Sequence, residues 1–316
     1  MIAPVPSLNF SLLVARMFNK KEATSFLQNS WGLQGVGEKL EASDCKNVLD
    51  EIVVLVQEKI PFQGITLMAT GSDERSRPTV EEIKQDCMTG IGGLCYSINV
   101  FTWGLLKGLG FSVQLCKSTV TSAGTYPNNH VLVLVSNVKK VGDLYLVDCG
   151  SGFPTFRAIP LDFDQESPVY HDSFLDYKYV RHDGRVLRMH GKGDRVERNE
   201  PPVEGIDLFL GKWRRFYSFA PDPSECLADF DTAFDDVYTV PGTTPFHNSP
   251  RAIRFPEKRA VMSVNNRALV ENEKGILVAT IMESDEEIIK FFGNHFANIE
   301  PDTVRRAIRE WRRVSV

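Results

Sequence analysis

Apolar residues recur at helical spacing over much of the first third of the chain. They follow one another at intervals of three or four through residues 8–30 and again through 48–56, which predicts two helices. Glycines within 32–37 predict a loop between them, and Pro61 ends the second helix because proline cannot continue one. A capping box at residues 79–82 predicts a further short helix. We therefore expect a helical N-terminal third.

Beyond residue 110 the pattern changes to alternation with a period of two, or to short continuous apolar runs. Such runs are typical of β-strands, and they occupy residues 111–115, 130–135, 143–148, 177–180, 186–189 and 213–219. Turn residues such as Asp183-Gly184 separate the later runs. The middle of the chain is therefore predicted to be an antiparallel sheet or barrel.

The last part of the chain combines both patterns. Residues 221–250 are rich in Pro, Asp and Thr and show few regular patterns, so we expect a linking or lid segment there. Strands near 258–264 and 275–281 and helices at 284–297 and 301–315 predict a small α/β unit. The sequence thus predicts an α+β multidomain protein with a helical domain (1–109), a β-barrel domain (110–220), an interdomain segment (221–250) and an α/β lid domain (251–316).

Composition and charge narrow the class of protein. The 316 residues are 42% hydrophobic and 24% charged, with a formal net charge of -5, which is typical of a folded globular protein and excludes disordered and fibrous classes. No basic surface is predicted, so nucleic acid is not an expected partner. The arginines of residues 305–313 are interpreted as the solvated face of a terminal helix, with binding of an anionic ligand as the alternative.

Apolar runs and cysteine spacing bear on location and on metals. No apolar run reaches the eighteen or so residues of a membrane span, and no signal-peptide pattern is found at residues 1–6. We therefore expect a cytoplasmic protein with no membrane partner. The six cysteines form no CxxC pair, so we expect reduced thiols, with neither a metal site nor a disulfide framework.

A cysteine follows three glycines in the stretch Thr89-Gly90-Ile91-Gly92-Gly93-Leu94-Cys95. Apolar residues recur at helical spacing after Cys95, which places it at or near a helix start. Unpaired N–H groups and the helix dipole favour a thiolate over a thiol at such a position. Cys95 is therefore a candidate nucleophile. The alternative is a small buried hydrophobic residue beside a tight turn.

A histidine and an aspartate lie on two predicted strands that follow. If the loop between these strands is centred on Lys139, His130 and Asp148 face each other across an antiparallel pair, within reach of a hydrogen bond. The carboxylate would fix the histidine tautomer and stabilise an imidazolium, which in turn would favour a thiolate at Cys95. A one-residue slip would turn one of the two side chains to the opposite face.

Other interpretations of these residues stay open. His130 can be a core residue of an apolar strand, and Asp148 a turn former before Gly150. The remaining histidines lie in polar or loop contexts and are expected at the surface: His171, His182, His190, His247 and His295.

The stretch Gly92-Gly93-Leu94-Cys95-Tyr96-Ser97-Ile98-Asn99 resembles the catalytic-cysteine motif of the arylamine N-acetyltransferases. Residues 60–65 are similar to that family's Pro-Phe-Glu-Asn-Leu segment, and residues 130–134 to its histidine strand. Residues 147–152 resemble its Val-Asp-Val-Gly-Phe-Gly, and residues 248–255 the opening of its third domain. The likeness extends over most of the chain.

The resemblance implies a helical bundle, a β-barrel and an α/β lid around a cysteine-protease-like core. It also implies ping-pong transfer of an acetyl group from acetyl-CoA to an arylamine, hydrazine or arylhydroxylamine. Cys95 would be the nucleophile that forms a thioester, His130 the base and later the acid, and Asp148 the residue that orients it. A papain- or transglutaminase-like cysteine hydrolase and an inactive relative that acts as a binding module are the alternatives.

Three positions depart from the family pattern. The family has Arg where this chain has Ile91, usually an acidic or amide residue where it has Ser97, and Phe where it has Ser151. The family's arginine helps to hold the domains together around the site, so its absence puts that support of Cys95 in doubt. The family's Phe lines the acceptor pocket, so Ser151 suggests an altered acceptor preference.

Four residues are candidate contacts for the coenzyme. The turn that contains Gly150 and Gly152 offers backbone N–H groups that could bind an anion, although a tight β-turn is the simpler interpretation. Ser249 and Arg251 lie in the segment that resembles the opening of the third domain. Arg251 falls where the family commonly has a small hydroxyl residue near the coenzyme. We expect it to contact a coenzyme phosphate from the lid side, with a solvated loop arginine as the alternative.

Overall fold

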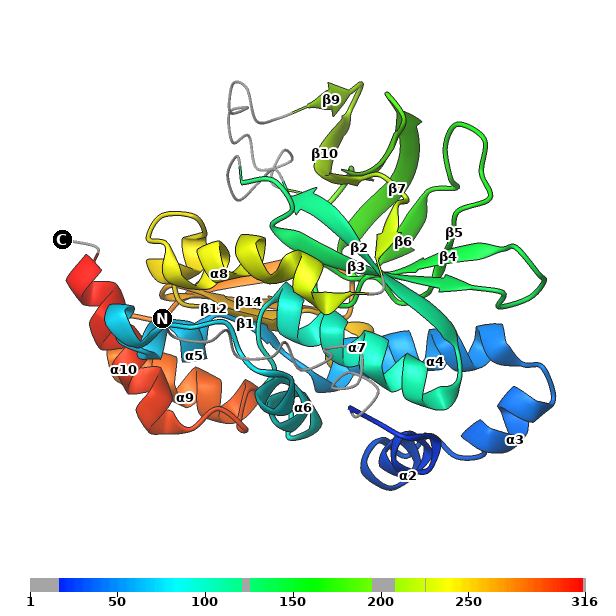
Figure 1. Ribbon diagram of the computed structural model, residues 1–316. Coiled ribbons are helices and arrows are strands. Elements are labelled where there is room, and N and C mark those ends of the chain that lie inside the picture. Colours follow the sequence, from blue (N-terminus) through cyan, green and yellow to red (C-terminus); the bar gives the residue numbers. More distant parts are fainter. Residues whose placement is uncertain (1–16, 121–125, 195–207, 225, 315–316) are drawn as a thin grey trace, which may run out of the picture.

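The computed structural model describes residues 17–120, 126–194, 208–224 and 226–314. Helices of the first third of the chain lie beside a curled β-sheet, and a second sheet with its own helices forms a further layer (Figure 1). This architecture confirms the predicted α+β class. The helices are α2 (Lys20–Trp31), α3 (Val36–Glu41), α4 (Cys45–Lys59), α5 (Ile65–Ala69), α6 (Val80–Met88), α7 (Cys95–Leu109), α8 (Asp231–Thr239), α9 (Asp285–His295) and α10 (Pro301–Val314).

Helix α7 lies at the centre of the helical layer and is buried along nearly its whole length. Apolar side chains lie on almost every side of this helix, so it has no broad polar face to expose to solvent. Helices α2 and α6 pack against it, as do strands β2 (Ser112–Val120) and β3 (His130–Ser136). The helix ends at Gly110, which adopts a positive φ of 98°. The helix that begins at Cys95 is therefore held by both layers.

The N-terminal helices depart from the predicted boundaries. Helix α2 begins at Lys20, after a capping box between Asn19 and Glu22, while residues 8–16 of the predicted helix lie outside the described residues. Helix α3 occupies part of the predicted glycine loop, so the loop prediction was too long. The capping box predicted at residues 79–82 is confirmed at the start of α6.

The central strands form one curled antiparallel sheet, in the order β5-β4-β3-β2-β10-β8-β7-β6, with β9 paired to β10 and β11 paired to β2. The predicted antiparallel pairing is confirmed. Its buried core is rich in aromatic side chains. The remaining strands are β4 (Leu144–Val147), β5 (Ile159–Pro160), β6 (Tyr170–Asp172), β7 (Leu175–His182), β8 (Arg185–His190), β9 (Phe209–Leu210), β10 (Trp213–Phe219) and β11 (Pro223–Ser224).

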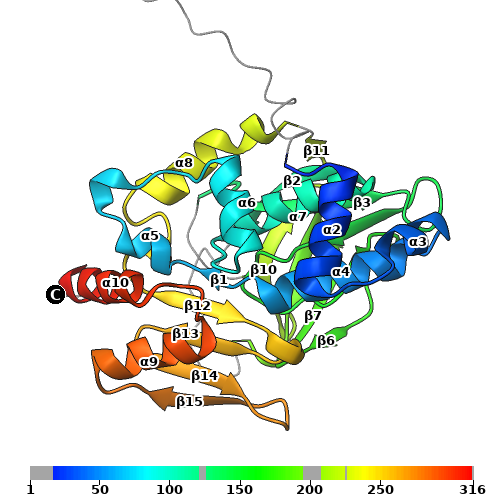
Figure 2. The same ribbon diagram turned by 90° about the horizontal axis from the view of Figure 1, so that it is seen from below.

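Four strands of the last part of the chain and one short strand from its first third form a five-stranded sheet, with α9 and α10 beside it (Figure 2). Apolar residues of α9 and α10 pack with the sheet in a separate core. The strands and helices predicted near 258–264, 275–281, 284–297 and 301–315 are confirmed, with residue 315 outside the described part of the chain. The strands are β1 (Phe62–Gln63), β12 (Arg251–Arg254), β13 (Val261–Val264), β14 (Arg267–Glu271) and β15 (Leu277–Ile281).

Strand β1 comes from much earlier in the chain than its neighbours in this sheet. Phe62 pairs with Ile253 of β12 and also forms a bridge with Gly93. The Gln63 N–H donates to the Gly93 carbonyl at 2.9 Å, and the Gly93 N–H donates to the Pro61 carbonyl at 3.2 Å. The sequence pattern predicted only a helix end here. The structure shows that this segment ties the C-terminal sheet to the turn before Cys95.

Residues 221–250 contain helical structure that the sequence pattern did not predict. Helix α8 follows the 3-10 turn η3 (Leu227–Phe230), and a second 3-10 turn, η4 (Pro245–His247), comes after it. The helix buries Phe234, Val237 and Tyr238. The last two follow Phe234 by three and four residues, so all three lie on one face of the helix. This apolar face is too short to stand out from the Asp- and Thr-rich sequence around it.

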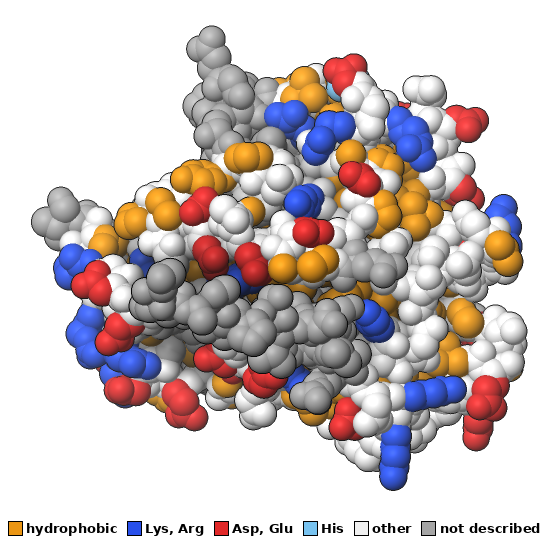
Figure 3. Space-filling model, in the orientation of Figure 1, with side chains coloured by type: hydrophobic (Ala, Val, Ile, Leu, Met, Phe, Trp, Pro, Cys, Tyr) orange, Lys and Arg blue, Asp and Glu red, His pale blue; other side chains and the backbone are white. Residues whose placement is uncertain are grey.

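The arginines of the C-terminal helix lie on its outer side, as predicted. Helix α10 buries an apolar stripe that includes Ile308 and Trp311. Basic and acidic side chains lie next to one another over this end of the molecule (Figure 3). Arg312 pairs with Asp285 at 3.0 Å, for example. Within the described ranges, no helix has both the length and the apolar character needed to cross a membrane.

Candidate active site

Cys95 is the first residue of α7, which confirms the predicted helix start. The turn before it needs glycine, because Gly92 has a φ of 74° and a Cβ there would lie 2.0 Å from the Pro61 carbonyl oxygen. The Cys95 side chain is buried, with its Sγ 3.8 Å from the carbonyl oxygen of Asn129. The thiol therefore lies at a helix N-terminus, immediately beside the strand that begins at His130.

His130 and Asp148 form a buried hydrogen-bonded pair. The His130 Nε2 lies 3.1 Å from Asp148 Oδ1, and the two side chains are 2% and 0% exposed. The predicted register was wrong, however. Strands β3 and β4 pair Val133 with Val147, which centres the loop on Lys140 instead of Lys139. That shift moves the partner position by two residues, so the side chains stay on one face and meet as diagonal neighbours.

Each member of this pair holds the other in its charged form. Burial on its own would lower the pKa of His130, but the charge and hydrogen bond of Asp148 outweigh it and, with a contact to Cys95, raise the pKa to about 10. Burial would likewise raise the pKa of Asp148, but His130 holds it below its ordinary value. Because Nε2 bonds Asp148, Nδ1 is the ring nitrogen left for the contact with Cys95.

Asn99 joins α7 to the end of β4 and was not singled out from the sequence. Its Nδ2 donates to the Val131 carbonyl at 2.7 Å and to Asp148 Oδ1 at 2.9 Å. Its Oδ1 accepts the N–H groups of Cys149 and Gly150, both at 3.0 Å. Asn99 is fully buried, one helical turn after the cysteine on the same face. A polar residue at this spacing in an apolar helix was a signal that could have identified it.

The glycine turn after Asp148 packs directly on the nucleophile helix. A Cβ at Gly150 would lie 3.0 Å from the Cα and carbonyl oxygen of Cys95, and one at Gly152, whose φ is 71°, would lie 3.0 Å from the Phe62 ring. The Gly150 N–H already donates to Asn99. The structure thus explains these glycines by close packing, and their contact with coenzyme stays a prediction.

Ser249 lies just before β12, the strand that pairs with β1, and Arg251 is the first residue of that strand. The Ser249 hydroxyl donates to Asn265 Oδ1 at 2.7 Å and accepts from Arg251 Nε at 3.0 Å. Arg251 is half-buried in a strand, so it is not the fully solvated loop arginine of the alternative interpretation, and its burial lowers its pKa. Its proposed coenzyme contact stays a prediction.

Arg77 links helix α8 to the residue that follows the nucleophile. Its Nη1 donates to Tyr96 Oη at 3.0 Å, and its Nε donates to Asp235 Oδ1 at 2.9 Å. It also pairs with Asp231. The family's arginine is replaced by Ile91 in this chain, and Arg77 supplies a different link between segments around Cys95. Sequence reasoning missed Arg77 because it lies among other charged residues of a polar loop.

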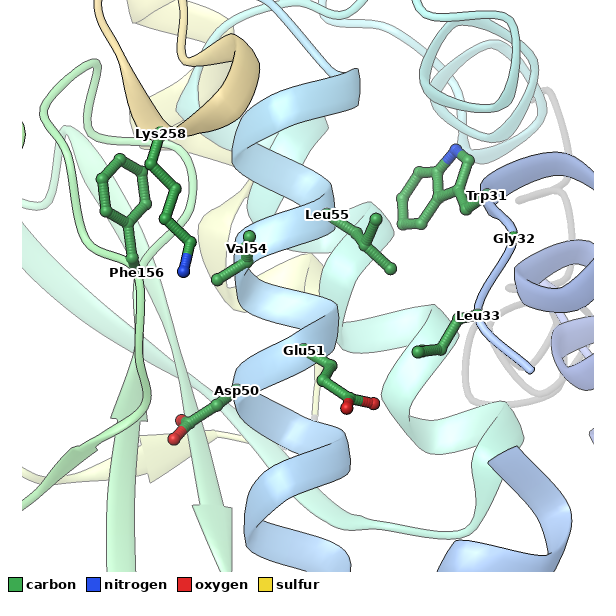
Figure 4. Close-up of a pocket in the computed structure, with 9 residues that line it drawn as sticks. All are labelled: Trp31, Gly32, Leu33, Asp50, Glu51, Val54, Leu55, Phe156 and Lys258. Atoms are coloured by element: carbon green, nitrogen blue, oxygen red, sulfur yellow. The ribbon is translucent and has the colours of Figure 1, made fainter. Parts of the chain in front are cut away.

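Two hollows of similar volume open on the surface. The first, of about 430 Å³, lies along α4 (Figure 4), and Cys95 does not line it. The second, of about 400 Å³, is lined by residues 92–94 before the cysteine and by Ser97 and Tyr238. The hydroxyl groups of Ser97 and Tyr238 lie 3.5 Å apart. The second hollow therefore borders the nucleophile turn, and α8 forms part of its wall.

Two histidines expected at the surface are buried. His190 is 1% exposed and stacks on Phe216 with 4.5 Å between ring centroids, and burial lowers its pKa to about 3. His247 is 5% exposed and lies 3.2 Å from the Tyr238 carbonyl oxygen. Their surroundings come from segments distant in sequence, so local polarity was misleading. Across the described ranges, no group of three or more His, Cys, Asp or Glu side chains could hold a metal ion.

Comparisons with known proteins show the family and the fold of this chain. A family model described as N-acetyltransferase matches residues 47–303. The "Uncharacterized acetyltransferase YvcN" of Bacillus subtilis (strain 168) is 29% identical over 237 residues, which cover 72% of this chain and 83% of that protein.

Solved structures of arylamine N-acetyltransferases share the fold. The protein from Mycobacterium abscessus superposes with a TM-score of 0.72 at 16% identity, covering 98% of this chain and 99% of that one. The protein from Mycobacterium marinum, solved in complex with CoA, has a TM-score of 0.70 at 16% identity and covers 90% and 98% of the two chains. The fold expected from the sequence motifs is thereby confirmed.

Proposed function

Because the chain belongs to the arylamine N-acetyltransferase family, we propose that it transfers an acetyl or other short acyl group from acyl-CoA to an arylamine, hydrazine or arylhydroxylamine. The acyl group would be carried as a thioester on Cys95. The observation that carries this proposal is the buried His130–Asp148 pair beside a cysteine at a helix N-terminus. Such an arrangement activates a sulfur nucleophile.

In the first half-reaction Cys95 gives its proton to His130 Nδ1, and the thiolate attacks the acyl-CoA carbonyl carbon. The carbon–sulfur bond to coenzyme A breaks, and the leaving sulfur takes the proton from His130. Asp148 keeps the imidazole oriented and offsets its positive charge during both steps. One thioester is exchanged for another, so little free energy separates the two states.

In the second half-reaction the amine nitrogen attacks the acyl carbon of the Cys95 thioester. His130 accepts a proton from the amine as the carbon–nitrogen bond forms, and it returns the proton to the Cys95 sulfur as that sulfur leaves. The products are the amide and the free thiol. The hollow that borders residues 92–94 is a candidate path for one of the two substrates.

The direct test is to incubate the protein with acetyl-CoA and to measure the mass of the intact chain and of its peptides. We expect a gain of one acetyl group on Cys95, and its loss when an arylamine is added. Cys95→Ser should abolish the gain, whereas Cys226→Ser, which changes an exposed cysteine, should not. If no acylation occurs, or if it occurs equally in Cys95→Ser, the proposal is wrong. Acylation followed by release of free acetate in the presence of amine would instead indicate a hydrolase.

A further inference from the structure

Arg188 is fully buried in the interior of the curled sheet. It lies on β8, directly opposite Tyr179 of β7 and Tyr217 of β10. Its guanidinium lies 4.5 Å from the ring centroid of Tyr177. An arginine cannot give up its charge under ordinary conditions, so a guanidinium at this depth needs a partner of opposite charge.

The hydrogen bonds of Arg188 go to neutral groups of the turn after Asp148. Its Nη1 donates to Thr155 Oγ1 at 2.8 Å and to Ser151 Oγ at 3.4 Å, and its Nη2 donates to the Pro154 carbonyl at 3.0 Å. The carboxylate near it is that of Asp148, whose Oδ2 lies 3.7 Å from Nη1. Arg188 therefore connects the charge of Asp148 with the turn that follows it.

The two oxygens of Asp148 have different surroundings. Oδ1 accepts a hydrogen bond from Asn99 and is hydrogen-bonded to His130. Oδ2 is buried and has no hydrogen-bond partner among the described residues, so Arg188 is the cation that faces it. The carboxylate thus lies between the imidazole on one side and the guanidinium on the other.

We propose that Arg188 is a positioning residue for the proposed triad: its fixed charge keeps Asp148 ionised and keeps Oδ1 directed at His130. The role assigned to Asp148 rests on the proposed function, but the charge relation between Arg188 and Asp148 does not depend on the identity of the substrates.

The proposal predicts the direction of a change in pH dependence. Arg188 is among the groups that hold the pKa of Asp148 low. Without this charge the buried carboxyl would take up a proton at higher pH, and a neutral carboxyl cannot stabilise the imidazolium of His130. Unit charges 3.7 Å apart shift a pKa by more than about one unit, even at an effective dielectric constant of about 20.

The other titratable groups around Asp148 do not titrate in the acidic range. Burial raises the pKa of Tyr179 to about 12 and the pKa of Tyr217 well above its usual range, and it also raises the pKa of Cys149. The pKa of His130 is raised to about 10. When the rate of Cys95 alkylation is plotted against pH, a change in the acidic limb of the curve therefore reports on Asp148 and on the Cys95–His130 pair that it supports.

The experiment compares Arg188→Gln, which loses the charge, with Arg188→Lys, which keeps it. The rate of Cys95 alkylation by iodoacetamide is measured across the acidic range in the parent and in both variants, and the rate of acylation by acetyl-CoA is measured beside it. Arg214→Met is the matched control, because Arg214 is a buried arginine of the same sheet that pairs with Asp194 at 2.6 Å. Alkylation needs no coenzyme, so it tests the inference even where acyl transfer is not observed.

We expect the acidic limb of alkylation to move up by about one pH unit or more in Arg188→Gln and to stay near the parent's in Arg188→Lys and Arg214→Met. Equal limbs in folded Arg188→Gln and the parent would overturn the proposal, as would equal shifts in Arg188→Gln and Arg214→Met. If Arg188→Gln does not fold, Arg188→Lys decides alone: a limb shifted by more than about one unit despite the retained charge would overturn it.

Discussion

Asn99 makes four buried hydrogen bonds that join the nucleophile helix to the strand end at Asp148, so Asn99→Ala is a sharp test of the site's construction. The substitution leaves two N–H groups, those of Cys149 and Gly150, and the Val131 carbonyl without this partner. Asp148 Oδ1 keeps His130. At about 1 kcal/mol for each of three buried orphaned groups, the low end of the usual range, the loss of unfolding free energy is about 3 kcal/mol.

The assay is urea unfolding of the parent and the variant, together with the rate of Cys95 acylation. Thr102→Val is the matched control, since Thr102 is also fully buried on α7 and donates its hydroxyl within the helix to the Ile98 carbonyl at 2.7 Å. That control should lose about 1 kcal/mol and acylate at nearly the parent's rate. Asn99→Ala should acylate more slowly, because the turn that follows Asp148 is no longer held against α7. A loss of stability no greater than the control's would refute the reasoning.

Four further predictions concern the proposed chemistry. Cys95 should react with iodoacetamide at neutral pH faster than every other thiol, because it alone combines a helix N-terminus with a contact to His130, while burial raises the pKa of Cys87, Cys116 and Cys149; equal labelling of all six would count against activation. Asp148→Asn should slow thioester formation about 100-fold or more, since an amide cannot offset the imidazolium charge, and a rate within about threefold of the parent's would show that Asp148 is only a turn residue. Arg251→Ala should raise the KM for acetyl-CoA about tenfold without changing the rate with a phosphate-free thioester; equal losses with both donors would assign Arg251 to the fold. The pKa of His130, raised from 6.5 to about 10, adds stability that is fully present below pH 6.5 and is lost as the pH rises through 10, so the urea midpoint of the parent should fall over this range more than that of His130→Gln.

Local sequence patterns were sufficient for the elements that contain the proposed chemistry. Apolar spacing predicted the helix that begins at Cys95 because that helix is apolar over several turns, and a period of 3.6 residues cannot be satisfied by a strand. The strands of His130 and Asp148 were found because each is a short, continuous apolar run. Side chains alternate between the two faces of a strand, so a shift of two residues keeps a side chain on the same face. The register error of two residues therefore left the contact between His130 and Asp148 intact.

Contacts between distant segments could not be derived in this way. Strand β1 has two residues and no periodicity of its own, so its pairing with β12 and Gly93 depends on where the last part of the chain docks. The link from Arg77 to α8 joins residues separated by about half of the chain's length, and nothing in the polar loop distinguishes Arg77 from its charged neighbours.

The electrostatics of the site depend on burial, and burial is a property of the assembled layers. Polar and apolar residues do not alternate regularly along β8, so its sequence does not show that Arg188 faces the interior. In the structure Arg188 is fully buried, 3.7 Å from Asp148. Asn99 and Asp148 would be ordinary polar side chains in water. The residue types near Cys95 are therefore properties of the sequence. The charge states of His130 and Asp148 arise because the assembled layers bring the two side chains within 3.1 Å of each other, where their charges and hydrogen bond outweigh the effect of burial.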